Sequence, residues 1–380
     1  MKEKVRDMPL MEDTSETINI CYPFIGSKAI EYVTDTLSGR WIGQGPKVDL
    51  FEKKFKEKFG VDKEAISVNS GTSALHLAYE LCDIKNGDEV IVPLFTCTAT
   101  NIPFLYKDVK LKFVDIDIET MNMDLDHVES LVTEKTKAIV PVHYGGLCND
   151  MDRLNKIASK YNIPIIQDAA HSIGTTYKGK QLAELSDYVM YSFQAIKHFT
   201  TGDGGMLLVN KELQDKAKRV RWFGIDRKAK QGGIWENDIT EIGYKYQMTD
   251  VAASIGLSGL EEIDYPINLR KKLFNHYCEK LTTNDVTIVG ESQKNEHGAW
   301  LFTIYVDNRF DLQTKLAENK IESNQMHFRN DRYSIFKKFT DGIEFPNMDK
   351  VEQNYLVLPL HHKMTTDDVD RVCEVINNGW

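Results

Sequence analysis

The chain has 380 residues, with 47 lysines and arginines against 57 aspartates and glutamates, a net charge of −10 and a hydrophobic content of 42%. This length is enough for a large core and for two domains. The acidic balance argues against a nucleic acid or an anionic membrane as the main partner, although it leaves room for a local basic pocket that holds a phosphorylated ligand.

The cysteines and the start of the chain argue against further classes of protein. No two of the six cysteines form a Cys-x-x-Cys pair, which argues against a disulfide framework and against a zinc site. The first residues lack the apolar core of a signal peptide, and no run reaches the length of a membrane span. We therefore expect a reduced, soluble, cytoplasmic protein that binds no metal and no membrane.

Short apolar runs rich in valine and isoleucine alternate with amphipathic segments from about residue 65 to residue 209. Such runs suit strands that are buried on both faces of a sheet. The expected fold class is therefore α/β, with a mostly parallel central sheet flanked by helices. The expected strands are 65–68, 89–93, 111–115, 138–142, 164–168, 187–193 and 205–209, and a helix is expected over 73–82.

The texture of the sequence changes after about Leu260. The pattern there predicts a helix over 270–281, a strand over 301–306 and a helix over 366–377. We expect a loose N-terminal arm over 1–18, a large domain over 19–260 and a smaller C-terminal α+β domain over 261–380.

The first candidate site is Asn69-Ser-Gly-Thr-Ser73, between an expected strand and an expected helix. Gly71 lets the backbone approach an anion, the helix start offers free N–H groups, and Thr72 and Ser73 add hydroxyl donors. These features suit a phosphate cradle. An ordinary turn with a serine or threonine cap is the alternative, and the motif alone favours it.

The second candidate site is Asp168-Ala-Ala-His171, at the end of another expected strand. A carboxylate there can keep the ring nitrogen of pyridoxal phosphate (PLP) protonated, because an opposite charge favours the charged form. The protonated ring is a better electron sink. Helix capping is an equally good explanation of Asp168 in isolation, and His171 either bonds the ring hydroxyl or is a packed histidine.

The third candidate is Lys197, which follows an expected strand ending near Ser192 and precedes Thr200-Thr-Gly-Asp-Gly-Gly205. A lysine that forms a Schiff base must lie in a cleft, often with a lowered pKa. A random lysine is almost always a solvated surface residue. The order of the three motifs distinguishes Lys197: a phosphate turn, then an acid for the ring nitrogen, then Ser-x-x-x-x-Lys.

This ordered set resembles the DegT/DnrJ/EryC1/StrS family of PLP-dependent nucleotide-sugar aminotransferases, which have fold type I. The matching motifs run through most of the chain. They are Trp41-Ile-Gly-Gln-Gly-Pro46, Ser70-Gly-Thr-Ser-Ala-Leu-His76, Gly87-Asp-Glu-Val-Ile-Val-Pro93, Val142-His-Tyr-Gly145, Asp168-Ala-Ala-His171, Ser192-Phe193 with Lys197, and Leu356-Val-Leu-Pro-Leu-His361.

The resemblance implies a role for each matching position. Lys197 would be the catalytic lysine that carries the cofactor as a Schiff base. Asp168 would face the ring nitrogen, and His171 would lie near the ring hydroxyl. The phosphate would be held by Gly71, Thr72, Ser73 and Ser192. The family also implies a homodimer with active sites shared between subunits.

Two positions depart from the family pattern. Cys97 stands where the family has an aromatic residue stacked on the cofactor ring, and sulfur offers less stacking area. The ring is then either bound differently or covered by Phe95. Lys245 stands where the family has an asparagine that reaches the phosphate of the neighbouring subunit, and a lysine can bind phosphate as a point charge. An exposed lysine near the interface is the alternative for Lys245.

The implied reaction is transamination from L-glutamate, through pyridoxamine phosphate, to a nucleotide-linked keto-deoxysugar. A 4-keto sugar is the first expectation and a 3-keto sugar the second, and the product would serve surface-glycan or lipopolysaccharide biosynthesis. Trp41, His327 and Arg329 are candidate substrate contacts, and packing or surface salt links are the alternatives for them. A non-catalytic regulatory protein on the same fold is the rival hypothesis, against which an intact Lys197 and Asp168 argue.

Overall fold

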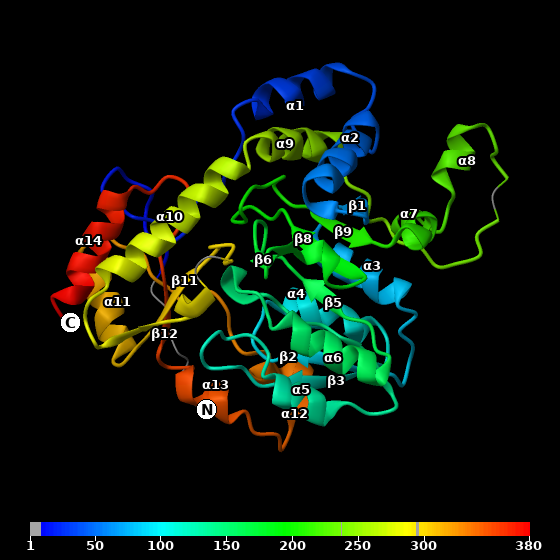
Figure 1. The fold of residues 1–380 in the computed structure, drawn as a ribbon. Helices are drawn as coiled ribbons and strands as arrows, with labels where there is room; N and C mark the ends of the chain where they lie inside the picture. Colours follow the sequence, from blue (N-terminus) through cyan, green and yellow to red (C-terminus); the bar gives the residue numbers. More distant parts are fainter. Residues whose placement is uncertain (1–8, 237, 294–295) are drawn as a thin grey trace.

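The computed structural model describes residues 9–236, 238–293 and 296–380. A central sheet lies among helices, and a smaller unit with its own helices lies beside it (Figure 1). The helices are α1 (Ala29–Ser38), α2 (Pro46–Phe55), α3 (Gly71–Leu81), α4 (Thr98–Asn101), α5 (Leu125–Leu131), α6 (Met151–Tyr161), α7 (Gln214–Arg221), α8 (Arg227–Gln231), α9 (Asp250–Glu261), α10 (Asp264–Lys280), α11 (Arg309–Glu318), α12 (Lys337–Thr340), α13 (Pro346–Val351) and α14 (Thr366–Asn377).

The central sheet is mostly parallel, as the sequence predicts. One part has the order β1 (Glu64–Val68), β9 (Gly205–Val209), β8 (Tyr188–Ser192), β5 (Ile166–Asp168), and the other has the order β3 (Lys110–Val114), β2 (Glu89–Pro93), β4 (Thr136–Ile139). Parallel bridges from Ile139 to Ile165 and from Val142 to Asp168 join the two parts. Strand β9 is antiparallel to both of its neighbours, so β1 and β8 run in the same direction as β5.

Each face of the sheet has its own hydrophobic core, because successive side chains along a strand point to opposite faces. Ile66 and Leu207 pack with α3 on one face. Ala65 and Leu208 pack with α2, α6 and α9 on the other face. Both faces are covered, which explains why the strands read as continuous apolar runs.

The smaller unit contains the antiparallel strands β10 (Val286–Ile288), β11 (Phe302–Val306) and β12 (Tyr355–Leu358), packed with α10, α11 and α14. Helix α10 runs from the large sheet's helices to this unit (Figure 1). Phe336 and Met348, however, pack in the core of the large sheet, although they follow β11 in the chain. The domain boundary near residue 260 stays a prediction.

Most of the expected elements appear within three residues of their predicted ends. Strands β2 and β9 and helix α14 have the predicted bounds, whereas β4 ends three residues earlier than predicted. Residues 1–8 of the arm expected over 1–18 lie outside the described residues, and Ile18 is buried in the core of the smaller unit. None of the helices in the described part of the chain is long and apolar enough to cross a membrane.

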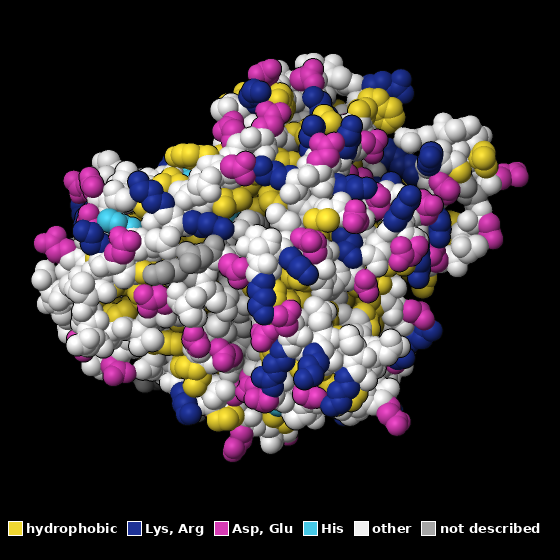
Figure 2. All heavy atoms as spheres, in the orientation of Figure 1, with side chains coloured by type: hydrophobic (Ala, Val, Ile, Leu, Met, Phe, Trp, Pro, Cys, Tyr) yellow, Lys and Arg dark blue, Asp and Glu magenta, His cyan; other side chains and the backbone are white. Residues whose placement is uncertain are grey.

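The surface carries both signs of charge. On the face that Figure 2 shows, lysines and arginines are interspersed with aspartates and glutamates, and neither sign forms a continuous field. This face therefore offers no extended basic surface of the kind that binds nucleic acid or an anionic membrane.

Candidate active site

The candidate residues gather at one edge of the large sheet. Strands β1, β5 and β8 are parallel to one another, so their carboxyl ends point toward the same edge. The Ser70–Ser73 turn follows β1, Asp168 ends β5, and Ser192 ends β8 with Lys197 just beyond it. Ligands bind at this edge in open α/β sheets, and the topology thus brings the three predicted motifs together.

The turn after β1 has the form of an anion cradle. The Ser70 hydroxyl accepts a hydrogen bond from the Ser73 N–H at 3.0 Å and so caps α3. The first N–H groups of a helix have no intrahelical partner, and those of Gly71 and Thr72 lie between the Ser70 cap and Ser73. A Cβ on Gly71 would lie 3.1 Å from the Cβ and Oγ of Ser192, so the two motifs are in contact.

We predict that Gly71→Ala lowers PLP affinity about 10- to 100-fold, because the added methyl group crowds Ser192 and costs roughly 1–3 kcal/mol. The measurement is a fluorescence or absorbance titration of the cofactor-free chain with PLP. Gly43→Ala is the matched control, since no atom lies within 4 Å of a Cβ built there. Equal PLP affinities for the two variants would show that the Ser70–Ser73 turn does not bind the phosphate.

Asp168 is buried, with 4% of its surface exposed. Its carboxylate accepts hydrogen bonds from the Thr100 hydroxyl at 2.7 Å and from the Ala170 N–H at 3.1 Å. Burial raises the pKa of Asp168, and the hydrogen bond from Thr100 opposes that shift. The nearby positive charge of Lys197 also lowers this pKa, which places the two groups within electrostatic range of one another.

Lys197 lies in a bend after β8 and is 8% exposed. Burial lowers its pKa from 10.5 to about 8, against the opposing attraction of Asp168. Its ammonium group lies over the indole ring of Trp300, with Nζ 3.7 Å from the ring centroid. A buried lysine with a lowered pKa has a larger neutral fraction near neutral pH than an exposed lysine, and only the neutral amine is a nucleophile or a proton acceptor.

Three aromatic rings are stacked beside this amine. His171 stacks on Trp300 with centroids 3.9 Å apart, and on His327 with centroids 5.3 Å apart. Nδ1 of His171 accepts a hydrogen bond from the Gly145 N–H at 3.3 Å. Nε2 of His327 is buried and has no hydrogen-bond partner in the described part of the protein. His171 and His327 therefore lie together in the site, and Nε2 of His327 is available to form a hydrogen bond with a ligand.

Buried histidines give the protein a predicted acid sensitivity. Burial lowers the pKa of His143 to about 4 and that of His327 to about 3, from 6.5. Below pH 6.5 the unfolded chain binds these protons and the folded chain does not, so the free energy of unfolding falls as pH drops from 6.5 toward 4. Each histidine contributes about 1.4 kcal/mol per pH unit.

Urea unfolding at a series of pH values measures this effect. His143→Gln should flatten the slope between pH 6.5 and 4 by about 1.4 kcal/mol per pH unit, because one titrating group is lost. An unchanged slope would show that His143 is protonated in the folded state.

The two departures from the family pattern lie at the surface. Cys97 is exposed and precedes α4. Phe95 is buried among Tyr144, His327 and Tyr355. The Lys245 ammonium is exposed and lies 5.4 Å from the centroid of the Phe223 ring.

The other two candidate substrate residues differ in environment. Trp41 is 39% exposed, with the Arg40 guanidinium 5.1 Å from its ring centroid. Arg329 is buried, and its guanidinium forms ion pairs with Asp331, Asp349 and Glu352. The charge of Arg329 is thus already balanced within the chain.

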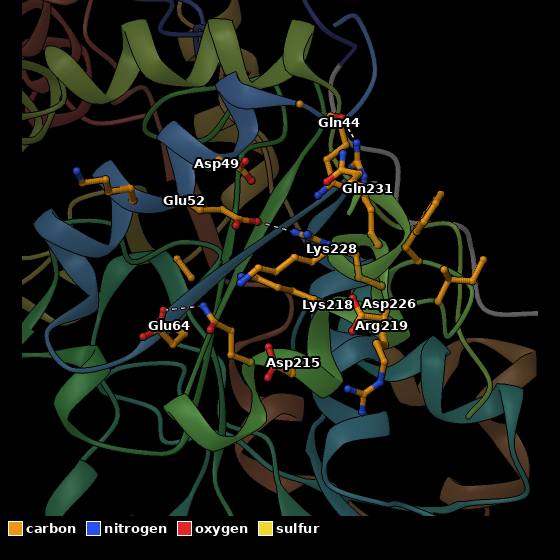
Figure 3. Close-up of a pocket in the computed structure, with 18 of the residues that line it drawn as sticks. Gln44, Asp49, Glu52, Glu64, Asp215, Lys218, Arg219, Asp226, Lys228 and Gln231 are labelled. Atoms are coloured by element: carbon orange, nitrogen blue, oxygen red, sulfur yellow. Dashed lines mark hydrogen bonds and ion pairs between the residues drawn. The ribbon is translucent and has the colours of Figure 1, made fainter. Parts of the chain in front are cut away.

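A separate cavity of about 760 Å³ lies among α2, β1, α7 and α8 (Figure 3). Many of its charged groups pair with one another: Arg221 with Glu52, and Lys56 with Glu64. Glu64 begins β1, so this cavity reaches the end of the strand opposite to the Ser70–Ser73 turn. It contains none of the residues that the sequence predicted for the cofactor.

Two residues of the site carry no signal of their own in the sequence. Thr100 bonds Asp168, and Trp300 underlies Lys197. Thr100 lies three residues after Cys97, which departs from the family pattern, and the residue type of Thr100 alone does not indicate a partner for Asp168. Trp300 precedes a strand in the smaller unit, and nothing in its neighbourhood indicates a ligand.

The residues present fit PLP. The glycine at position 71 leaves room that a Cβ would fill, a helix start supplies free N–H donors, and a buried acid and a buried lysine lie at the same strand edge. A mostly parallel sheet with this arrangement at its carboxyl edge defines the fold-type I class of PLP-dependent enzymes.

The chain belongs to the DegT/DnrJ/EryC1/StrS aminotransferase family, whose model matches residues 23–377. It is a PLP-dependent sugar aminotransferase, which confirms the predicted family, fold class, activity and cofactor.

Relatives cover almost the whole chain. It is 33% identical over 365 residues to the UDP-4-amino-4,6-dideoxy-N-acetyl-beta-L-altrosamine transaminase of Campylobacter jejuni, covering 93% of this chain and 94% of the relative. It is 31% identical over 386 residues to the UDP-4-amino-4-deoxy-L-arabinose–oxoglutarate aminotransferase of Shewanella sediminis, covering 96% and 98%. The structure of Spr1654 from Streptococcus pneumoniae in its PMP form matches with a TM-score of 0.88 and 30% identity, covering 95% and 98%.

Proposed function

We propose that this enzyme transfers an amino group from L-glutamate to a nucleotide-linked 4-keto-deoxysugar. The observation that carries the proposal is the buried Lys197, with its lowered pKa, at the same strand edge as the buried Asp168. Two relatives support the finer points: one is named for a UDP-linked 4-amino-dideoxy sugar, and the other for a UDP-linked 4-amino sugar and oxoglutarate.

Bound PLP would supply an electron sink for the carbon that gains or loses the amino group. Asp168, whose carboxylate is fixed by Thr100, would hold the proton on the ring nitrogen. The turn of Gly71, Thr72 and Ser73 with Ser192 would hold the phosphate, and His171 would lie beside the ring. Lys197 would carry the cofactor and, as a free amine, accept and return the transferred proton at Nζ, since its lowered pKa keeps a neutral fraction.

We also propose that two copies of the chain share their active sites, with Lys245 reaching the phosphate bound by the neighbouring subunit. The exposed side chain of Lys245 supports this role. So do large apolar side chains that are exposed near it, Phe223 at 44% and Ile242 at 79%, because such groups are often covered in an interface. Trp41 and His327 remain the proposed substrate contacts.

The experiment is a screen of nucleotide-linked 4-keto and 3-keto deoxysugars with L-glutamate, read by mass spectrometry. We expect a gain of one amino group on a 4-keto acceptor together with 2-oxoglutarate formation. A product from 3-keto acceptors alone would overturn the position of amination. A product from a keto sugar that carries no nucleotide would overturn the acceptor class and leave the cofactor assignment intact.

The same protein allows a test of the shared site. Lys245→Ala should lower PLP affinity about tenfold, the loss of roughly 1.4 kcal/mol expected for one phosphate contact, without changing the dimer measured by light scattering. Lys230→Ala, also on the segment after α7, is the control. Full PLP affinity in Lys245→Ala would contradict the role of Lys245.

A further inference from the structure

Trp300 lies directly against the amine of Lys197. It precedes β11, it is 3% exposed, and Nζ of Lys197 is 3.7 Å from the centroid of its ring. That distance is well within the range of a cation–π interaction, and both groups are buried, so water competes little for the ammonium group. Lys197 itself belongs to the large sheet, whereas Trp300 comes from the segment that leads into the smaller unit.

Both the indole ring and the backbone of Trp300 are held by contacts within the described structure. Its N–H donates a hydrogen bond to the carbonyl oxygen of Ile196 at 3.0 Å, so the ring is tied to the residue next to Lys197. The backbone N–H of Trp300 donates a hydrogen bond to the Gly145 carbonyl oxygen at 3.0 Å. The buried Arg270 donates to the Trp300 carbonyl oxygen at 3.2 Å. His171 stacks on the ring with an interplanar angle of 17°.

We propose that Trp300 is a positioning residue for Lys197: its aromatic face holds the ammonium group in the site whenever that amine is not bonded to the cofactor. This inference rests on the proposed role of Lys197. The hydrogen bond from the indole N–H to Ile196 keeps the ring in register with the lysine backbone, so the amine returns to one place after each proton transfer. A side chain without an aromatic face would fill the space but would not attract the cation.

The interaction also affects the charge on the amine. Burial disfavours the ammonium form of Lys197, and the negative face of the indole ring favours it. The ring therefore keeps the pKa of the lysine higher than burial alone would set it. The same lysine can then accept a proton and release it near neutral pH.

The test measures the pH midpoint of Lys197 in the full chain in its pyridoxamine-phosphate form, where the amine is free. Competitive labelling with acetic anhydride, read by peptide mass spectrometry, gives this midpoint without any turnover. We expect Trp300→Leu to lower the midpoint by about one pH unit and Trp300→Phe to change it little, because phenylalanine keeps an aromatic face. Trp235→Leu, at a tryptophan that is 75% exposed, is the matched control.

A second experiment changes the charge distribution of the indole ring and keeps its shape. Replacing tryptophan by increasingly fluorinated tryptophan in the otherwise unchanged chain weakens the negative face, and should lower the Lys197 midpoint step by step. In the Trp300→Phe background the fluorination effect should vanish, which excludes the other four tryptophans as its source. This series still tests the proposal if the Trp300→Leu variant fails to fold.

An unchanged or raised midpoint in Trp300→Leu, equal shifts in the Leu and Phe variants, or no response to fluorination would overturn the proposal. A variant that loses only thermal stability, with its midpoint unmoved, would show a merely structural tryptophan. Borohydride reduction separates this proposal from the proposed function. If PLP becomes attached to a residue other than Lys197, the proposed role of the lysine fails whatever the midpoint is.

Discussion

Lys197→Ala is expected to lower the rate of amino transfer from glutamate at least roughly a thousandfold, within the range that a positioned acid–base group contributes. The variant loses both the amine that carries the cofactor and the group that moves the proton. Among the lysines of the described residues, Lys197 alone is buried, and it lies against Trp300 at the carboxyl edge of the sheet. Single-turnover formation of 2-oxoglutarate, followed by mass spectrometry, measures the loss.

Lys211→Ala is the matched control, because Lys211 is exposed and lies after β9, away from the strand ends that carry the site. Borohydride reduction of the wild-type enzyme should attach the cofactor to a peptide that contains Lys197. A Lys197→Ala enzyme that keeps its rate within tenfold of the wild type would assign the chemistry to a different residue.

Asp168→Asn is expected to lower the rate about 100- to 1000-fold, similar to the loss of one preorganised electrostatic contact in other active sites. Asparagine keeps the shape and can still accept a hydrogen bond from Thr100, but it has no negative charge to hold a proton on the ring nitrogen. PLP affinity should fall much less than the rate. The measurements are single-turnover rates and a pH titration of the cofactor's absorbance.

Thr100→Val separates the charge of Asp168 from its orientation. This variant removes the 2.7 Å hydrogen bond to Asp168 and leaves the charge, so we expect a rate loss of about tenfold, the equivalent of roughly 1.4 kcal/mol. If Thr100→Val were as damaging as Asp168→Asn, the position of the carboxylate would matter as much as its charge.

The large sheet could be predicted because its strands are buried on both faces and read as apolar runs. The start of helix α10 could not be predicted as well. The sequence predicts a start at residue 270, and the helix begins at Asp264 with Pro266 in its first turn. A proline is tolerated there, because the N–H that it lacks would have had no partner within the helix. Pro266 therefore made the first turn of α10 resemble a helix-breaking segment in the sequence.

The site could be predicted only where its residues lie in ordered motifs. Asp168 ends one strand and Lys197 follows another, and a topology in which these strands are parallel brings their ends together. Thr100 and Trp300 enter the site through contacts between segments that are far apart in the chain. Such contacts depend on packing of the whole fold, which no local pattern encodes. Arg329 is a candidate substrate contact from the sequence, and its ion pair with Asp349, twenty residues further along the chain, is another contact that depends on the packing of the fold.

The pairing of β1 has a consequence for the order in which the protein is made. Among the strands of the described residues, β1 is hydrogen-bonded to β9 alone. We therefore expect the Ser70–Ser73 turn at its end to take a fixed place only after Gly205–Val209 has left the ribosome. Contacts between such distant segments form slowly, since the entropy of closing the intervening loop is lost first. Trp300 and His327 come later still. Tight retention of PLP is therefore a property of the finished chain, and a truncated or partly folded copy should release the cofactor on simple gel filtration.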